Sequence, residues 1–176
     1  MTSAPALCSP GSGTGFLGAL AIPAELYWVM RDPVALAGMS YPRRTEWDRL
    51  HDAGIGHVVC LTHDPVPYDP TPLTVGAHRL EDLFARAEPT DPLHEAAVVH
   101  AAAADVVTRL ADGTGVVVHC HAGRGRTGAV IGVALVRLGH EPEAVIDWLH
   151  RAQRTRGKRG WPEQPWQARI VREAVV

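Results

Sequence analysis

Apolar residues along this chain follow two different spacings, and the change between them predicts alternating strands and helices. Short runs rich in valine, leucine and isoleucine are typical of buried strands. Longer segments in which apolar residues return every three or four positions are typical of helices that bury one face. The short runs predict strands at Leu26–Met30, Val34–Ala37, His57–Leu61 and Val116–Val118, and a further strand-to-loop passage at His78–Leu83.

Helices are expected where a capping residue precedes an apolar repeat and a glycine follows it. In the longest one, Asp91–Leu110, Asp91 is the expected N-cap, Pro92 occupies the first turn and Gly113 follows the last turn. We expect its core face to contain Leu93, Ala97, Val98, Ala101, Ala104, Val107 and Leu110. The other predicted helices are Thr45–Ala53, Arg126–Leu138, Pro142–Arg154 and Gln164–Val175.

Length and composition limit the possible classes of protein. With 176 residues the chain fits one domain, expected at 23–176, after a leader at 1–22 that is rich in glycine, serine, proline and alanine and is expected to be flexible. The formal net charge of −2 excludes a generally basic nucleic-acid binder. No continuous apolar stretch reaches the 18 or so residues of a membrane span.

The three cysteines, Cys8, Cys60 and Cys120, are odd in number and lack CxxC spacing. This pattern favours a reducing cytoplasm and argues against both a disulfide framework and a zinc site. Lys158 is the only lysine among many arginines, and together with the abundant alanine this suggests a GC-rich bacterial genome.

The richest chemistry lies in one stretch, His119–Gly128, between a predicted strand and a predicted helix. Gly123 and Gly125 let the backbone curl so that several N–H groups point inward at the helix N-terminus. Such a ring is an anion cradle, and phosphate is its common occupant. Cys120 would lie at its base, where the same field favours the thiolate, and Arg126 would grip two phosphate oxygens. A thiolate that faces a clamped phosphoryl group predicts nucleophilic phosphoryl transfer.

The order His119-Cys120, five residues, then Arg126-Thr127-Gly128 resembles the signature of cysteine-dependent protein tyrosine and dual-specificity phosphatases. The resemblance implies an α/β domain with a central twisted, mostly parallel sheet of about four to five strands flanked by helices. It also implies a phosphomonoester hydrolase that forms a cysteinyl-phosphate and needs neither a metal ion nor another cofactor. A sulfurtransferase loop fits the two ends of the motif poorly. A buried structural cysteine is the other alternative, but it leaves the glycines, arginines and threonine around the thiol unexplained.

The resemblance also assigns roles within the loop. Cys120 is the expected nucleophile, and Arg126 with the backbone N–H groups stabilises the charge on the phosphoryl oxygens. Thr127 is expected to assist departure of the thiolate, and His119 to order the loop. The other expected substrate-binding positions are His121, Ala122, Gly123, Arg124 and Gly125.

The reaction also needs a proton donor for the leaving oxygen, and a carboxylic acid is the usual choice. Asp82 resembles the general-acid aspartate of the family, which lies on a loop between a strand and the long helix. Other carboxylates remain alternatives, and the proline-rich loop His63–Pro72 is expected to form one wall of the cleft. The alternatives to Asp82 are Asp64, Asp69, Glu81 and Asp91.

The expected substrate is a phosphorylated protein or peptide, with phosphotyrosine favoured. The phosphoinositide phosphatases related to this family carry basic residues at the positions of His121 and Arg124, so a phosphoinositide or inositol polyphosphate is the alternative. An alternative of another class is a phosphate-binding interaction module with weak catalysis. Neither nucleic acid nor an inserted membrane is expected as a partner, and the oligomeric state is left open.

Cys60 suggests a regulatory hypothesis. It ends the strand that leads toward Asp82, as a backdoor cysteine does in the lipid-phosphatase relatives. A reactive Cys120 that becomes oxidised could then be trapped as a reversible disulfide with Cys60. The alternative is that Cys60 is an ordinary buried core cysteine.

Overall fold

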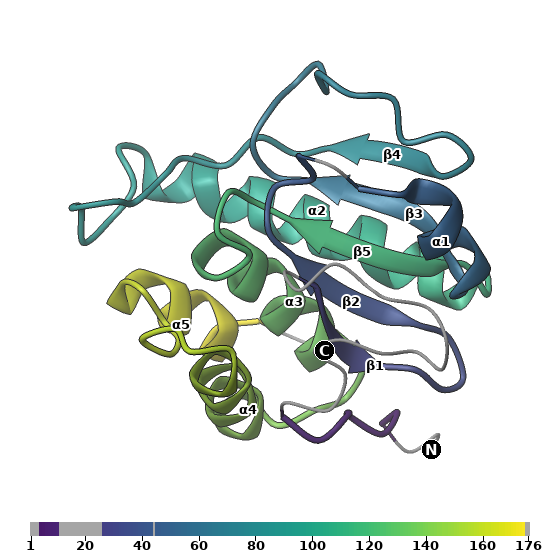
Figure 1. The fold of residues 1–176 in the computed structure, drawn as a ribbon. Helices are drawn as coiled ribbons and strands as arrows, with labels where there is room; N and C mark the ends of the chain where they lie inside the picture. The colour runs from purple at the N-terminus through teal and green to yellow at the C-terminus, as the bar shows by residue number, and fades with distance from the viewer. Residues whose placement is uncertain (1–3, 11–25, 44, 175–176) are drawn as a thin grey trace.

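The computed structural model describes residues 4–10, 26–43 and 45–174, and its centre is a five-stranded sheet (Figure 1). The strands lie in the order β1-β2-β5-β3-β4. β1 is antiparallel to β2, while the other three pairs are parallel. The predicted α/β fold with a mostly parallel sheet is therefore confirmed. The strands are β1 Leu26–Met30, β2 Leu36–Met39, β3 Ile55–Cys60, β4 Thr74–Ala77 and β5 Gly115–His119.

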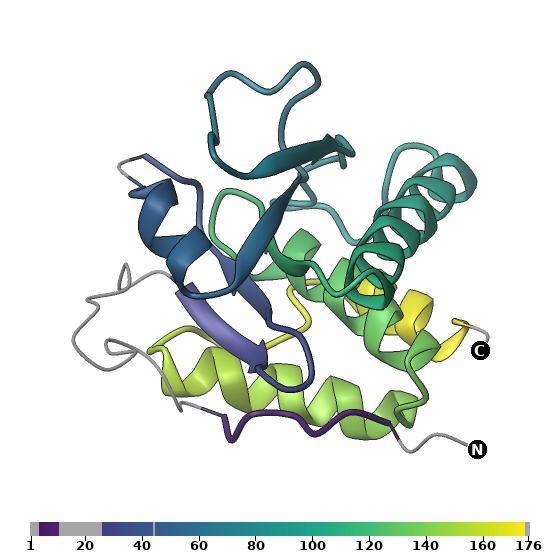
Figure 2. The same ribbon diagram turned by 90° about the vertical axis from the view of Figure 1, so that its right-hand side faces the viewer.

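Helices cover both faces of the sheet, as the view in Figure 2 shows. One face carries the two central helices, which pack on β5, and two further helices lie beyond them. Among the described residues, the opposite face carries one short helix, which packs against β3. The helices are α1 Trp47–Asp52 on this second face, and α2 Pro92–Ala111, α3 Gly125–Arg137, α4 Pro142–Thr155 and α5 Pro165–Arg172 on the first.

The topology brings three strand ends together at one edge of the sheet. β5 lies between β2 and β3 and runs parallel to both, so the last residues of these strands are neighbours: His119 of β5 pairs with Met39 and with Cys60. In such sheets, ligands bind outside the carboxyl ends of the strands. The loop that follows His119 is thus placed between the segments that follow β2 and β3.

Two strand assignments from the sequence need correction. The strand expected at Val34–Ala37 is displaced to Leu36–Met39, and the sequence pattern missed β4 altogether. β4, Thr74–Ala77, is an edge strand with an exposed or half-exposed Thr-Val-Gly-Ala sequence, so it lacks the apolar run by which buried strands are recognised. The segment His78–Leu83 contains neither strand nor helix.

The predicted core face of α2 is correct only in part, since Val98 and Val107 are half-buried and pack against the core. Leu93 is 86% exposed, and of the seven predicted core positions only Leu110 is buried. Alanine and valine occur on every side of this helix, so their spacing does not define which side faces the sheet. The buried residues are Glu95, Val99, Ala102, Ala103, Val106 and Leu110.

Most of the predicted flexible leader, 1–22, lies outside the described residues. Its described part, 4–10, runs beside β1 and α4 (Figure 2). The Cys8 N–H donates a hydrogen bond to the Val29 carbonyl (2.8 Å), and Trp148 Nε1 donates one to the Cys8 carbonyl (2.7 Å). No helix in the described ranges combines the length and apolar character needed to cross a membrane.

A cluster of polar side chains joins α2 to β3 and to the edge strand β4. His57 of β3 is 1% exposed, with Nδ1 2.6 Å from Thr74 Oγ1 and Nε2 3.2 Å from Asp105 Oδ2. His78 Nε2 lies 3.1 Å from the same Asp105 oxygen. Burial lowers the pKa of His57 by more than the Asp105 carboxylate raises it. Burial opposes the charged form of Asp105, but hydrogen bonds from His78 and His57 outweigh burial and lower the pKa of Asp105.

These pKa shifts predict that the protein loses stability on mild acidification. Unfolded His57 takes up a proton near its ordinary pKa of about 6.5, whereas the folded protein resists that proton. The stabilisation is therefore complete above that value and declines as the pH falls toward the folded pKa. The free energy of unfolding in urea should fall between pH 7.5 and 5.5, with His57 contributing at most about 1.4 kcal/mol per pH unit.

His57→Gln provides the comparison, since every other histidine remains in this variant. We expect a smaller dependence of unfolding free energy on pH than in the wild type. An identical dependence in the two proteins would contradict the assignment to His57.

Candidate active site

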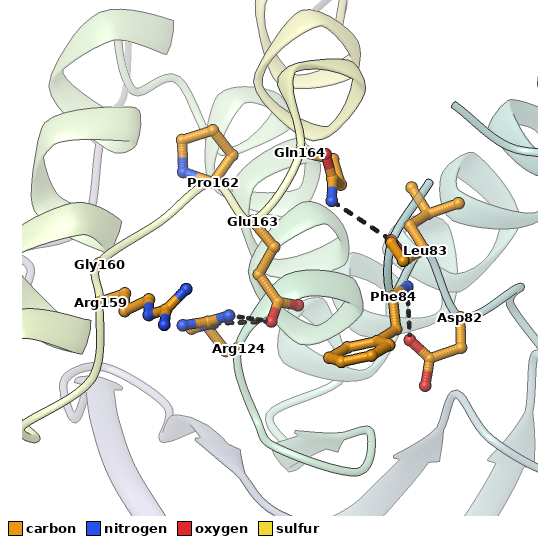
Figure 3. Close-up of a pocket in the computed structure, with 10 residues that line it drawn as sticks. Asp82, Leu83, Phe84, Arg124, Arg159, Gly160, Pro162, Glu163 and Gln164 are labelled. Atoms are coloured by element: carbon orange, nitrogen blue, oxygen red, sulfur yellow. Dashed lines mark hydrogen bonds and ion pairs between the residues drawn. The ribbon is translucent and has the colours of Figure 1, made fainter. Parts of the chain in front are cut away.

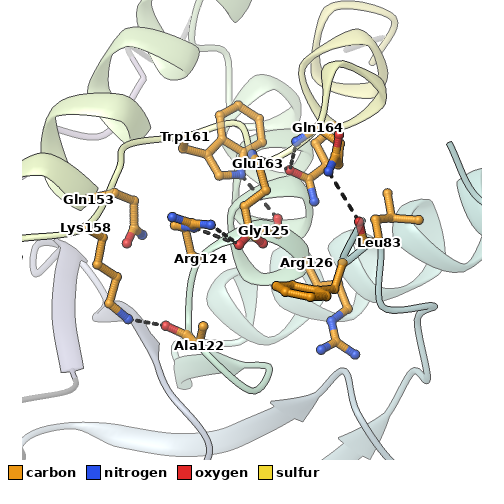
Figure 4. Close-up of polar contacts among 12 residues, drawn as sticks. Leu83, Ala122, Arg124, Gly125, Arg126, Gln153, Lys158, Trp161, Glu163 and Gln164 are labelled. Carbon is orange, nitrogen blue, oxygen red and sulfur yellow. Dashed lines mark hydrogen bonds and ion pairs between the residues drawn. The ribbon is translucent and has the colours of Figure 1, made fainter. Parts of the chain in front are cut away.

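The peptide groups that follow β5 are held in one orientation by bonds to their carbonyl oxygens. The Tyr41 N–H donates to the His121 carbonyl (3.0 Å), and the Gly128 N–H donates to the Arg124 carbonyl (2.7 Å). Side chains from other parts of the chain donate hydrogen bonds to the carbonyls of Ala122, Gly123 and Gly125 (Figure 4). Ser40 and Lys158 donate to Ala122, Gln153 and Arg156 donate to Gly123, and Trp161 donates to Gly125.

The N–H groups on the opposite sides of these peptide groups are the ones expected to form the anion cradle. In a trans peptide the N–H points away from the carbonyl, so five outward carbonyls direct the N–H groups of residues 122–126 inward. None of these N–H groups donates a hydrogen bond to another residue in the described ranges. They surround the N-terminus of α3, whose dipole adds a partial positive charge. The anion cradle expected from the glycine spacing stays a prediction.

Both glycines of the turn are required by close contacts. Gly123 has φ of +62°, and a Cβ on it would approach the Met39 backbone to 2.6 Å. A Cβ on Gly125 would overlap the carboxylate of Glu163.

Cys120 directly follows β5 and is 2% exposed. It is a free thiol at the entrance of the cradle segment. In the first turn of α3, the fully buried Thr127 has a hydroxyl group without a hydrogen-bond partner among the described residues. This hydroxyl is therefore available for a further hydrogen bond.

The signature histidine is held by the proline-rich loop. His119 is fully buried, and its Nε2 lies 2.5 Å from the hydroxyl of Tyr68, while its Nδ1 lies 3.4 Å from the Cys120 carbonyl. Trp47 stacks on the Tyr68 ring with centroids 5.4 Å apart. The sequence analysis did not single out Tyr68. The sequence feature that could have indicated Tyr68 is an aromatic residue inside the proline-rich loop, which follows the strand next to β5.

Cys60 also interacts with His119. Burial disfavours the Cys60 thiolate, but the hydrogen bond and charge of His119 outweigh burial and lower the pKa of Cys60 to about 6. Cys60 pairs with His119 across β3 and β5, and successive side chains of a strand face opposite sides of a sheet. Cys120 lies one residue beyond this pair, and both thiols are free. A disulfide between Cys60 and Cys120 would need a rearrangement of the strand ends, and it stays a prediction.

Asp82 and Arg126 lie together beside the cradle. Arg126 is 11% exposed; its Nη2 donates to Asp82 Oδ2 (2.9 Å), and its Nη1 donates to the Leu80 carbonyl (3.3 Å). Asp82 is 56% exposed, and its other oxygen accepts from the Phe84 N–H (3.2 Å). Asp82 thus combines solvent access with direct contact to the signature arginine.

Three of the four alternative carboxylates accept hydrogen bonds from residues of their own segments. Asp69 accepts two hydrogen bonds from Thr71, and Glu81 is bound by Arg86 and Thr90. Asp91 caps α2 through the His94 N–H (3.0 Å). Asp64 is exposed in the proline-rich loop.

The two basic positions of the loop differ from what their sequence suggests. Arg124 donates from Nε (2.8 Å) and from Nη2 to a single oxygen of Glu163 (Figure 4). At the other position, partial burial and the charge of Arg126 lower the pKa of His121. The sequence analysis did not identify Glu163, which lies far from the loop in the chain.

A pocket of roughly 330 Å³ opens beside the cradle. In Figure 3, Asp82 and Phe84 lie on one side of it and Arg124 and Arg159 on the other. Phe84 is 90% exposed. Gln164, at the start of α5, links the two sides by donating to the Leu83 carbonyl (3.3 Å). The lining residues are Asp82, Leu83, Phe84, Ala85, Arg124, Arg159, Gly160, Pro162, Glu163 and Gln164.

Comparisons with known proteins identify the family and the fold. Residues 23–164 match the family model described as Swiss Army Knife protein, DSP-PTPase phosphatase domain. No curated protein sequence matches significantly.

Solved structures with the same fold include Tk-PTP in the active form, with 22% identity and a TM-score of 0.57 over 81% of this chain and 92% of that one. Human DUSP28 has 19% identity and a TM-score of 0.61 over 79% and 92%. PTPMT1 in complex with PI(5)P has 20% identity and a TM-score of 0.57 over 78% and 88%.

The contact between Tyr68 and His119 generates a stability prediction. Tyr68→Phe removes the hydroxyl partner of a fully buried ring nitrogen, so we expect the free energy of unfolding to fall by about 1–3 kcal/mol. Chemical denaturation measures this change. Tyr41→Phe is the matched control, because its ring also packs near His119 (centroids 5.8 Å apart) but its hydroxyl makes no hydrogen bond with any described residue. Equal losses in the two variants would contradict the role of the Tyr68 hydroxyl.

Proposed function

The chain belongs to the DSP-PTPase phosphatase domain family, and on this basis we propose that it hydrolyses phosphomonoesters through a cysteinyl-phosphate, with phosphotyrosine in proteins as its substrate. The proposal rests on the inward N–H groups of residues 122–126, which follow Cys120 directly in the chain, and on the ion pair between Arg126 and Asp82. A phosphate dianion is the group that such donors accommodate best.

In the proposed first step, the Cys120 thiolate attacks phosphorus, so that a sulfur–phosphorus bond forms as the bond to the leaving oxygen breaks. The guanidinium of Arg126 and the inward N–H groups stabilise the negative charge on the three other oxygens. Asp82 gives its proton to the leaving oxygen. Bound phosphate would replace Asp82 as the partner of Arg126, which frees the carboxyl group for this transfer.

In the second step, a water molecule displaces sulfur from phosphorus, and the Asp82 carboxylate accepts a proton from that water. In this scheme Thr127 donates a hydrogen bond to the departing thiolate, and the support for this role is that its buried hydroxyl has no partner among the described residues. His119 holds the end of β5 through the Tyr68 hydroxyl and the Cys120 carbonyl, and transfers no proton.

An aromatic monophosphate suits the surroundings of the cradle better than a polyphosphate does. Phe84 presents an exposed ring two residues after Asp82, on the side where the leaving group must lie. Aromatic pairs add roughly 0.5–1.5 kcal/mol beyond the area they bury. Arg124 is engaged by Glu163, so one of the two basic positions offers its charge to a carboxylate of the same chain.

Turnover of para-nitrophenyl phosphate by the wild type and by Cys120→Ser tests the function directly. We expect hydrolysis by the wild type and a rate at background level for the variant, which lacks the thiolate. Hydrolysis by Cys120→Ser at a rate near that of the wild type would exclude Cys120 as the nucleophile. A folded wild type that binds phosphate but hydrolyses no aryl phosphate would favour the interaction module.

Asp82→Asn separates the general acid from the rest of the site. For a phosphotyrosine peptide, we expect kcat to fall by about 10²- to 10⁴-fold, because the leaving phenoxide is no longer protonated. For para-nitrophenyl phosphate the loss should be much smaller, since its leaving group needs little protonation.

Asp69→Asn serves as the control, because that carboxylate is engaged by Thr71 outside the cradle. It should leave both rates near those of the wild type. Equal losses for the two substrates in Asp82→Asn would assign Asp82 a structural role.

A further inference from the structure

Glu163 occupies the place where a second anion of a substrate would meet Arg124. The guanidinium of Arg124 directs two N–H groups at one Glu163 oxygen, and arginine N–H groups of this kind also bind the oxygens of a phosphate. The other Glu163 oxygen is packed against the backbone of Gly125, inside the loop itself. The carboxylate of Glu163 is thus an internal anion within the substrate-binding loop.

The position of Glu163 is fixed by the fold. Its N–H donates to Gln167 Oε1 (2.8 Å), and the same oxygen accepts from the Gln164 N–H at the start of α5 (3.2 Å). The Arg124 and Glu163 side chains are 21% and 31% exposed, so water screens this ion pair less than a surface pair.

The pair changes what the neighbouring pocket can accept. Asp82 and Glu163 contribute two carboxylates to its lining, and Arg124 and Arg159 contribute two cations, so the formal charges balance. A second phosphate that approached Arg124 would have to displace Glu163 and leave that carboxylate without its partner near added negative charge. An uncharged aromatic ring of a substrate that packs on Phe84 neither displaces Glu163 nor adds negative charge beside it.

We propose that Glu163 is a specificity-determining residue, which withholds Arg124 from the substrate and so makes the site select monophosphorylated aromatic groups over polyphosphorylated ligands. This inference rests on the proposed function and adds the substrate class that the site rejects. Glu163 touches neither the phosphoryl group nor Cys120 in this scheme, and it acts through Arg124.

The test compares the wild type with Glu163→Gln, which keeps the side-chain length and removes the negative charge. The measured quantities are kcat/KM for a phosphotyrosine peptide and for inositol 1,3,4,5-tetrakisphosphate. We expect the ratio of the second to the first to rise by at least about tenfold, because the freed guanidinium gains charge-assisted hydrogen bonds to phosphate. The gain should appear mainly in KM for the tetrakisphosphate, because Arg124 does not contact the reacting atoms.

Two further variants exclude a general effect of charge or of folding. Glu143→Gln changes the net charge by the same amount, but it disrupts the exposed pair of Glu143 with Arg172, so the ratio should stay at the wild-type value. Adding Arg124→Gln to Glu163→Gln should remove the gain. A gain that persists without Arg124, or one that Glu143→Gln reproduces, would overturn the proposal.

A binding measurement keeps this inference separate from the proposed chemistry. Calorimetry in a Cys120→Ser background needs no turnover, and it should show inositol tetrakisphosphate binding within about threefold of inorganic phosphate at matched ionic strength. With Glu163→Gln added, the tetrakisphosphate should bind at least about tenfold more tightly than before. Tight tetrakisphosphate binding with Glu163 intact overturns the inference, and this result does not depend on whether Glu163→Gln folds. If the wild type hydrolyses no aryl phosphate, only the proposed function is overturned.

Discussion

The anion cradle depends on the direction in which five consecutive carbonyl groups point. Four of the carbonyls of residues 121–125 accept hydrogen bonds from other segments, and that of Arg124 accepts one from Gly128 in α3, so the reverse side of each peptide directs an N–H group inward. The donors come from the segments after β2 and α4, from Trp161 and from α3 itself. The site is therefore shaped by elements far apart in the chain, and the glycines provide the conformational freedom that these bonds use.

The rest of the fold holds this loop between rigid supports. β5 is fully buried between β2 and β3, and α3 buries almost its whole circumference against its neighbours. Tyr68 fixes the last residue of β5 from the side of β3, while Trp161 binds the first turn of α3 from the side of α4 and α5. These supports favour a fixed cradle and leave the solvent-exposed Asp82 segment as its more accessible border.

The sequence identified features that depend on residues close together in the chain. The buried valines, the glycine spacing and the apolar helix predicted the strand, the turn and α3 around Cys120, and the structure has all three. Features that depend on distant partners were not predictable. The orientation of α2 is set by the sheet that it covers, and β4 is recognisable only by its pairing with β3. Arg124 looked like a free cation because nothing in the local sequence reveals that Glu163 folds back onto it.

The extended residues 4–10 matter for the edge of the sheet. β1 is a terminal strand of the sheet, and its outer backbone groups are a surface on which a strand from another molecule could add. The hydrogen bond from Cys8 to Val29 places a short piece of the same chain against that edge, and Trp148 secures it. The opposite edge, β4, is short and begins with an exposed threonine and valine. Residues 4–10 thus occupy part of the outer edge of β1, although they lie far along the chain from the signature loop.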